Sequence, residues 1–92
     1  MNSSLGILEE TVLIIILMKD ESHSVEVAKV YEKHVGQTIS IPAIHVVLKR
    51  MEKKGLVKSR MGEPTPERGG KRKKIYQGTP QGYRIASGIQ ER

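Results

Sequence analysis

The sequence predicts a mainly α-helical fold with one small antiparallel β-hairpin (α+β). Two observations support this prediction. Three segments within residues 1–54 carry apolar side chains at helical spacing, and two short segments of alternating polarity then flank a loop rich in Gly and Pro. At 92 residues the chain is long enough for one domain with a modest core. That core must be aliphatic, because the sequence contains no Phe and no Trp.

The first helix is expected over residues 4–18, with Ser4 as its N-cap. The apolar run from Val12 to Met18 is also compatible with a strand, but the helical spacing that leads into it favours a helix. Because the second half of this helix is apolar nearly all round, it should be buried on more than one side. We therefore expect a partner subunit to cover one of its faces.

The second helix is expected to begin with Ser24 as its cap and to end at Gly36, where a left-handed residue is needed. Residues 37–40 are too short for a helix and suit one short strand. The third helix is expected over residues 41–54, and Gly55 ends it. Its core face follows the spacing i, i+3, i+4, i+7 and consists of Ile44, Val47, Leu48 and Met51. The opposite face is basic.

The hairpin is expected to pair residues 56–61 with residues 71–77. Tyr76 suits a packing residue of this hairpin. Thr79 then caps a last helix, which starts at Pro80 and is weakened by Gly82 and Gly88.

Charge divides the chain into two unequal halves. Residues 1–48 hold three lysines against six carboxylates, whereas residues 49–92 hold thirteen Lys and Arg residues against four carboxylates. This separation suggests a polyanion partner for the basic half. A merely basic, solvated surface is the alternative interpretation of the same charges.

Three helices followed by a basic hairpin is the order of a winged helix-turn-helix, in which the third helix enters the major groove of duplex DNA and the hairpin lies along the flanking backbone or minor groove. Arg68 and residues 71–74 place five cations within seven residues. Such a cluster gains affinity for DNA by releasing counterions. Cations on a wing hold DNA without choosing a sequence, so sequence choice should rest on the third helix.

The sequence resembles the PadR family of bacterial transcriptional regulators over nearly its whole length. The most specific stretch is residues 62–76, with the sequence GEPTPERGGKRKKIY, followed by Thr79-Pro80 and Gly82. Residues 25–28 and residues 48–57 also match. The chain departs from the family at His23-Ser24, where relatives have Tyr-Gly, and at residues 42–45, where Pro-Ala-Ile-His replaces Gly-Ala-Leu-Tyr.

The resemblance implies a homodimeric repressor whose two third helices lie in successive major grooves of a near-palindromic operator, about one helical turn apart. It also implies that relatives continue into a longer C-terminal helix or a helical domain that packs against the partner's first helix. We therefore expect residues 1–92 to form a single DNA-binding domain, with residues 80–92 as the start of a dimerisation helix. Some relatives respond to small aromatic or drug-like compounds, and no effector is indicated here.

Three groups of residues are candidates for these contacts. On the recognition helix, the expected DNA contacts are Ser40, Pro42, Ala43, His45, Val46, Lys49, Arg50 and Lys53. On the wing, they are Arg60, Arg68, Gly69, Gly70, Lys71, Arg72, Lys73 and Lys74. The expected dimer interface consists of Leu5, Leu8, Val12, Ile16, Tyr83, Ala86 and Ile89.

Other functions are less well supported by the sequence. With no cysteine, and with three histidines spaced eleven residues apart, neither a metal site nor a cofactor is expected. Glu63 and Glu67 lack a neighbouring nucleophile or base, so an enzyme is the least favoured class. No apolar run approaches the roughly 20 residues that span a bilayer, and a cytoplasmic location is expected. A nonspecific nucleic-acid binder, including one for RNA, and a winged-helix protein-interaction module remain alternatives.

Overall fold

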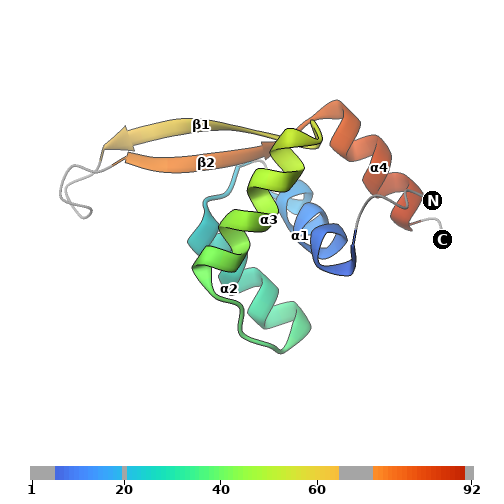
Figure 1. The fold of residues 1–92 in the computed structure, drawn as a ribbon, viewed down its shortest axis with the longest axis horizontal. Coiled ribbons are helices and arrows are strands. Elements are labelled where there is room, and N and C mark those ends of the chain that lie inside the picture. Colours follow the sequence, from blue (N-terminus) through green and yellow to red (C-terminus); the bar gives the residue numbers. More distant parts are fainter. Residues whose placement is uncertain (1–5, 20, 65–71, 91–92) are drawn as a thin grey trace.

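The computed structural model describes residues 6–19, 21–64 and 72–90 of the 92-residue chain. It confirms the predicted fold class: helices α1, α2 and α3 precede a two-stranded antiparallel hairpin, β1 and β2, and α4 follows (Figure 1). The hairpin extends away from the helices, and α4 lies beside α1 (Figure 1). No helix in the described ranges is long and apolar enough to cross a membrane.

Helix α1 spans Ile7–Met18 and begins later than predicted. Its N-cap is Gly6, so the predicted cap at Ser4 is wrong. The side chain of Glu9 explains the later start, because its Oε1 accepts a hydrogen bond from the amide of Gly6 at 3.5 Å. The other carboxylate oxygen of Glu9 lies 3.0 Å from Nζ of Lys54, which ties the start of α1 to the end of α3.

Helix α2 spans Ser24–Val35, and its N-cap is His23 rather than the predicted Ser24. Nδ1 of His23 accepts a hydrogen bond from the amide of Glu26 at 3.4 Å, and Oε1 of Glu26 accepts one from the amide of His23 at 3.2 Å. This reciprocal pair satisfies two amides of the first turn. Gly36 ends the helix with a φ of 80°, in the left-handed conformation that the sequence predicted.

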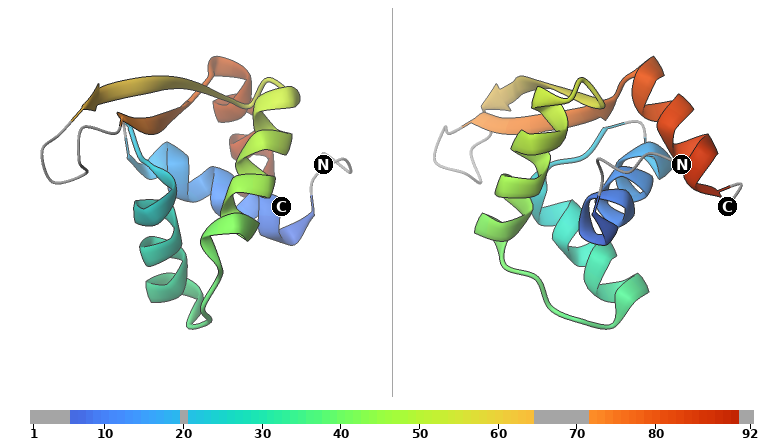
Figure 2. Two further views of the ribbon diagram at one scale, coloured as in Figure 1. Left: turned by 60° about the vertical axis from the view of Figure 1, so that its left-hand side comes forward. Right: turned by 45° about the vertical axis from the view of Figure 1, so that its right-hand side comes forward.

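The predicted short strand at residues 37–40 does not form. The backbone that does join the hairpin comes from the segment before α2. The amide of Ser22 donates to the carbonyl of Tyr76 at 3.0 Å, and the amide of Tyr76 donates to the carbonyl of Ser22 at 2.7 Å. This bridge is one of the contacts that attach the hairpin to the helices, and Figure 2 shows the segment leading into α2 beside β2.

Helix α3 spans Ile41–Lys53. Ser40 caps it, with its hydroxyl accepting a hydrogen bond from the amide of Ala43 at 3.2 Å. The predicted core face is buried, and it consists of Ile44, Val47, Leu48 and Met51. Gly55 follows with a φ of 77°, which allows the chain to turn directly into the hairpin.

Strand β1 spans Val57–Pro64 and pairs with β2 over Arg72–Gly78, so β1 runs three residues further than predicted. Ser59 stands opposite Tyr76, and the register shifts between Met61 and Pro64. Tyr76 is only 2% exposed, which confirms it as a packing residue of the hairpin.

Helix α4 spans Pro80–Gln90. As predicted, the hydroxyl of Thr79 caps it by accepting a hydrogen bond from the amide of Gly82 at 3.0 Å, and the same hydroxyl donates to the carbonyl of Gly55 at 2.6 Å. Gly82 was expected to weaken this helix. In the structure it also lets α4 approach the turn between α3 and β1, because a Cβ at this position would lie 2.2 Å from the carbonyl oxygen of Leu56.

The core joins one face of each of the first three helices to the base of the hairpin. Val12 and Ile16 are wholly buried within it. Their assignment to a dimer interface is therefore wrong for this fold, because neither side chain has surface left to offer to another chain. The helical pattern of α1 could not separate the two faces, since both are apolar.

Replacing Gly82 with Ala should destabilise the protein by about 1–3 kcal/mol, because the added methyl group would collide with backbone rather than with a movable side chain. Urea unfolding followed by circular dichroism measures this change. Gly88→Ala is the matched control in the same helix, since nothing lies within 4 Å of its Cβ position. The control should be stabilised by about 0.4–1 kcal/mol. Equal free energies of unfolding for the two variants would contradict the close approach of Gly82 to the carbonyl of Leu56.

Candidate nucleic-acid interface

The outward face of α3 carries three cations, Lys49, Arg50 and Lys53. All three are exposed, and none forms an ion pair in the described part of the chain. Pro42, His45 and Val46 extend this face toward the start of the helix, and the side chain of Val46 is 50% exposed.

The remaining predicted residues of this helix lie at its first turn. Ala43 is half-buried, and its amide is held by the hydroxyl of Ser40, so both residues help to define where the helix begins. The structure thus brings the predicted recognition residues to one side and one end of α3.

One face of the hairpin is joined to α3 through Glu52. The hydroxyl of Ser59 donates a hydrogen bond to Oε2 of Glu52 at 2.6 Å, and Nζ of Lys74 lies 3.9 Å from Oε1 of the same carboxylate. Lys74 also lies over the ring of Tyr76, at 5.6 Å from its centroid. Glu52 therefore holds β1 against α3 and weakly attracts β2, a role that sequence reasoning missed because the contacts cross elements.

The other face of the hairpin carries Lys58 and Arg60, since alternate residues of a strand point to opposite sides. Arg60 forms an ion pair with Glu21, in the segment before α2. Lys58 is exposed and has no ion-pair partner among the described residues. Of the two cations, only Lys58 therefore has its charge entirely available to an external partner.

Part of the predicted wing lies outside the described residues: Arg68, Gly69, Gly70 and Lys71. Arg72 begins β2, and only its backbone is described. Lys73 is half-buried, with its Nζ 3.4 Å from Nε2 of His23.

His23 belongs to this surface and was not among the predicted contacts. Its Nδ1 accepts the amide of Glu26, so the proton of the neutral ring lies on Nε2, which is 3.4 Å from Oε1 of Glu26. In this tautomer Nε2 carries the proton and does not accept a hydrogen bond from Lys73. The spacing of His23 and Glu26, at the cap and third helical positions, is the sequence signal that could have located this residue.

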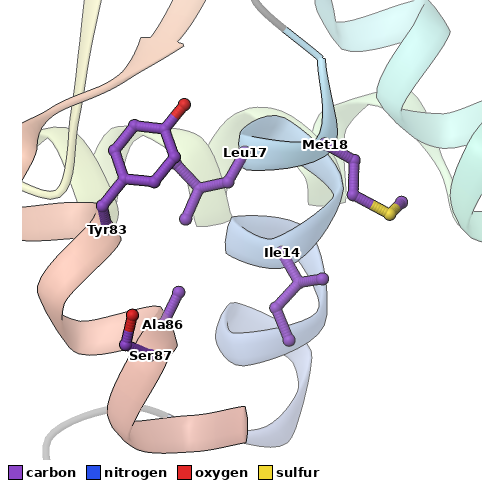
Figure 3. A pocket seen from close by; sticks show the side chains of 6 residues that line it. All are labelled: Ile14, Leu17, Met18, Tyr83, Ala86 and Ser87. Carbon is purple, nitrogen blue, oxygen red and sulfur yellow. The ribbon is translucent and has the colours of Figure 1, made fainter.

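A second surface lies between α1 and α4. It is a groove of about 200 Å³, and Figure 3 shows the side chains that line it: Ile14, Leu17, Met18, Tyr83, Ala86 and Ser87. Met18 and Tyr83 are 58% and 51% exposed. The groove therefore presents apolar side chains to the outside.

The other five predicted dimer residues relate differently to this groove. Tyr83 and Ala86 line it, although Ala86 is itself buried, and Leu8 is half-buried against the core. Leu5 lies outside the described residues, and the side chain of Ile89 is not described. Ile14 and Met18 were missed, because the all-round apolar pattern of α1 gives no sign of which residues face outward.

No metal centre accompanies either surface: the described residues contain no group of three or more His, Cys, Asp and Glu side chains that could hold an ion.

Comparison with known proteins places this geometry among regulators of transcription. The model of the Transcriptional regulator PadR-like family matches residues 12–87. No curated protein matches the chain. A PadR-like transcriptional regulator from Bacillus cereus is 26% identical, with a TM-score of 0.77 over 94% of this chain and 80% of that one. A putative transcriptional regulator from Thermoplasma acidophilum is 25% identical, with a TM-score of 0.78 over 92% and 82% of the two chains.

Bacillus subtilis PadR in complex with operator DNA has the same fold, with a TM-score of 0.80 at 18% identity over 94% of this chain. The present chain spans about half of that protein, 48% of its length.

A double-mutant cycle on Ser59→Ala and Glu52→Ala should give a coupling energy of about 1 kcal/mol, because the hydroxyl donates to a carboxylate that is only partly exposed to solvent. The free energy of unfolding of the four proteins in urea measures it. Thr38→Ala, at an exposed threonine with no hydrogen bond among the described residues, is the control and should change stability by less than about 0.5 kcal/mol. A coupling energy of zero would mean that Glu52 does not hold the hairpin in solution.

Proposed function

Because the chain belongs to the PadR-like family of transcriptional regulators, we propose that it is a homodimeric repressor that binds a near-palindromic operator in duplex DNA. The observation that carries this proposal is the set of free cations on α3, beside a hairpin that carries more of them. The B. subtilis relative was solved in complex with operator DNA, which supports the same class of partner for this chain.

Helix α3 enters the major groove in this proposal. The groove is about 12 Å wide and admits one helix, and its base edges distinguish all four base pairs. The residues that contact DNA from this helix are Ser40, Pro42, Ala43, His45, Val46, Lys49, Arg50 and Lys53. Lys49 lies in the middle of the exposed face and is the best placed of the free cations to reach a base edge.

The hairpin lies along the flanking backbone or in the adjacent minor groove. Its contacts are Arg60, Arg68, Gly69, Gly70 and residues 71–74. These cations add affinity without sequence choice, because phosphates are the same at every step of the duplex. Binding alone accounts for repression, so no catalysis is part of the proposal.

The dimer forms through the groove between α1 and α4. A two-fold axis would place Met18 and Tyr83 of each chain against the same surface of its partner, burying side chains that are now half exposed or more. In this arrangement residues 1–92 form one DNA-binding domain, and α4 is the start of the dimerisation helix. Half-sites then lie about one helical turn apart.

Lys49→Ala should weaken binding to an operator selected from random fragments by about 1–3 kcal/mol and should weaken binding to random duplex far less. Fluorescence anisotropy at several salt concentrations measures both affinities. Arg84→Ala is the control, because it removes one positive charge from exposed α4. It should change both affinities slightly and equally. Wild-type protein that binds operator and random duplex equally at every salt concentration would refute the regulator and leave a nonspecific binder.

Tyr83→Glu combined with Met18→Glu should convert the dimer to a folded monomer, because charges replace apolar contacts at an interface. Sedimentation equilibrium gives the mass, and circular dichroism reports whether the fold survives. Val35→Glu is the control on α2, since that side chain is 42% exposed and lies outside the groove. A double variant that keeps the mass of a dimer would place the interface elsewhere.

A further inference from the structure

A basic pocket opens where three elements meet. It has a volume of about 270 Å³ and lies between the first turn of α2, the outward face of α3 and the hairpin. Its lining includes His23 and Ser24 at the start of α2, His45 from α3, and Lys73 and Lys74 from β2. Among the residues that the structure describes, no Asp or Glu lines it. Two lysines and two histidines therefore converge on one hollow from three separate parts of the chain.

A neighbouring pocket differs from the basic pocket because carboxylates line it. His23 and Lys73 also line that second pocket, but there Glu21 and Glu26 accompany them. The carboxylates of this region thus lie on one side of the His23 and Lys73 pair, and the basic pocket lies on the other. Only the basic pocket has a charge that suits an anion.

The charge of Lys74 is only partly neutralised within the protein, so it can also attract an anion. Its nearest carboxylate oxygen, on Glu52, is 3.9 Å away, and the two side chains are 46% and 35% exposed. An ion pair this long and this well solvated neutralises a lysine only in part.

Hydrogen-bond donors that suit an oxyanion also lie at this pocket. The amides of Ser24 and Val25 are the first two of α2, and within the described residues neither has an acceptor. The Ser24 hydroxyl likewise has no partner there. These neutral donors add to the basic side chains, which supply the charge.

We propose that this pocket binds one phosphate of the DNA backbone, which is a phosphodiester monoanion, and that His45 and Lys74 contact the same phosphate. This proposal rests on the proposed function. With α3 in the major groove and the hairpin on the flanking backbone, the strand that borders the groove passes between them, which is where the pocket opens. His45 then contacts the backbone rather than a base edge. Its contribution to affinity is the same for every sequence.

A double-mutant cycle on a random-sequence 20-base-pair duplex tests the shared phosphate without needing an operator. His45→Gln and Lys74→Gln should each weaken binding, and Lys74→Gln should also lower the slope of log affinity against log salt by about one. The double variant should lose less affinity than the product of the single losses, by about threefold or more, because either change already disrupts the same contact. Losses that simply multiply, or no loss from His45→Gln, would overturn the proposal.

The matched control pairs His45→Gln with Lys58→Gln, a lysine on the opposite face of the same hairpin. These two losses should multiply. Because Lys74 also contacts Glu52 and Tyr76, each variant is checked by thermal unfolding, and Lys74→Arg should restore both affinity and coupling. If the Lys74→Gln variant is unfolded, the cycle is repeated with Lys73→Gln, because Lys73 lines the same pocket. Coupled losses would again support the shared phosphate, and losses that multiply would overturn it.

Inorganic phosphate serves as the second probe, followed through the amide resonance of Ser24 by NMR. A shift in the wild type that His45→Gln reduces supports an oxyanion site, provided the DNA cycle also shows coupling. Phosphate binding without coupling on DNA would assign the pocket to the free ion and overturn the backbone contact. If the wild-type protein showed no sequence preference, the proposed regulator function would be refuted instead. The double-mutant cycle would still test the shared phosphate, because it uses a duplex of random sequence.

Discussion

The surface proposed to bind DNA depends on how the hairpin is attached to the helices, and the attachment centres on Tyr76. Its side chain is buried, its backbone exchanges two hydrogen bonds with Ser22, and Ser59 opposite it is held by Glu52 of α3. A two-stranded hairpin is marginally stable on its own in water. Without these contacts, the cations of β2 would have no fixed position relative to those of α3, and no pocket would form between them.

The separation of charge along the sequence has a different meaning in three dimensions. Glu9 pairs with Lys54, and Glu21 pairs with Arg60, so carboxylates of the acidic first half bind cations of the basic second half. The Glu21–Arg60 pair is exposed and contributes little stability, whereas Glu9 in the other pair is mostly buried. Both pairs also shape the distribution of charge, because Lys49, Arg50 and Lys53 on one face of α3 are left without an ion-pair partner among the described residues.

The sequence predicted the fold class, the buried face of α3 and the two glycine helix ends, because each of these depends on local spacing or backbone conformation. One failure has a deciding contact that is distant in the chain: Ser22 was not expected to pair with the hairpin, since one residue leaves no periodic pattern. The caps of α1 and α2 were also mispredicted, although their deciding contacts are local, between Gly6 and Glu9 and between His23 and Glu26. For the candidate site, the exposed face of α3 was predictable, but the pocket beside His45 required three elements to be placed together.

The contact between Gly82 and Leu56 has a mechanical consequence. The amide of Thr79 bonds to the carbonyl of Leu56, its hydroxyl bonds to Gly55, and the backbone of Gly82 lies where not even a methyl group would fit. The first turn of α4 is therefore held tightly to the turn between α3 and β1. Because the hairpin is also attached to the other helices through Glu52 and Ser22, a tilt of α4 would turn α3 and the hairpin together, and the angle at which two such chains met would set the distance between their basic faces.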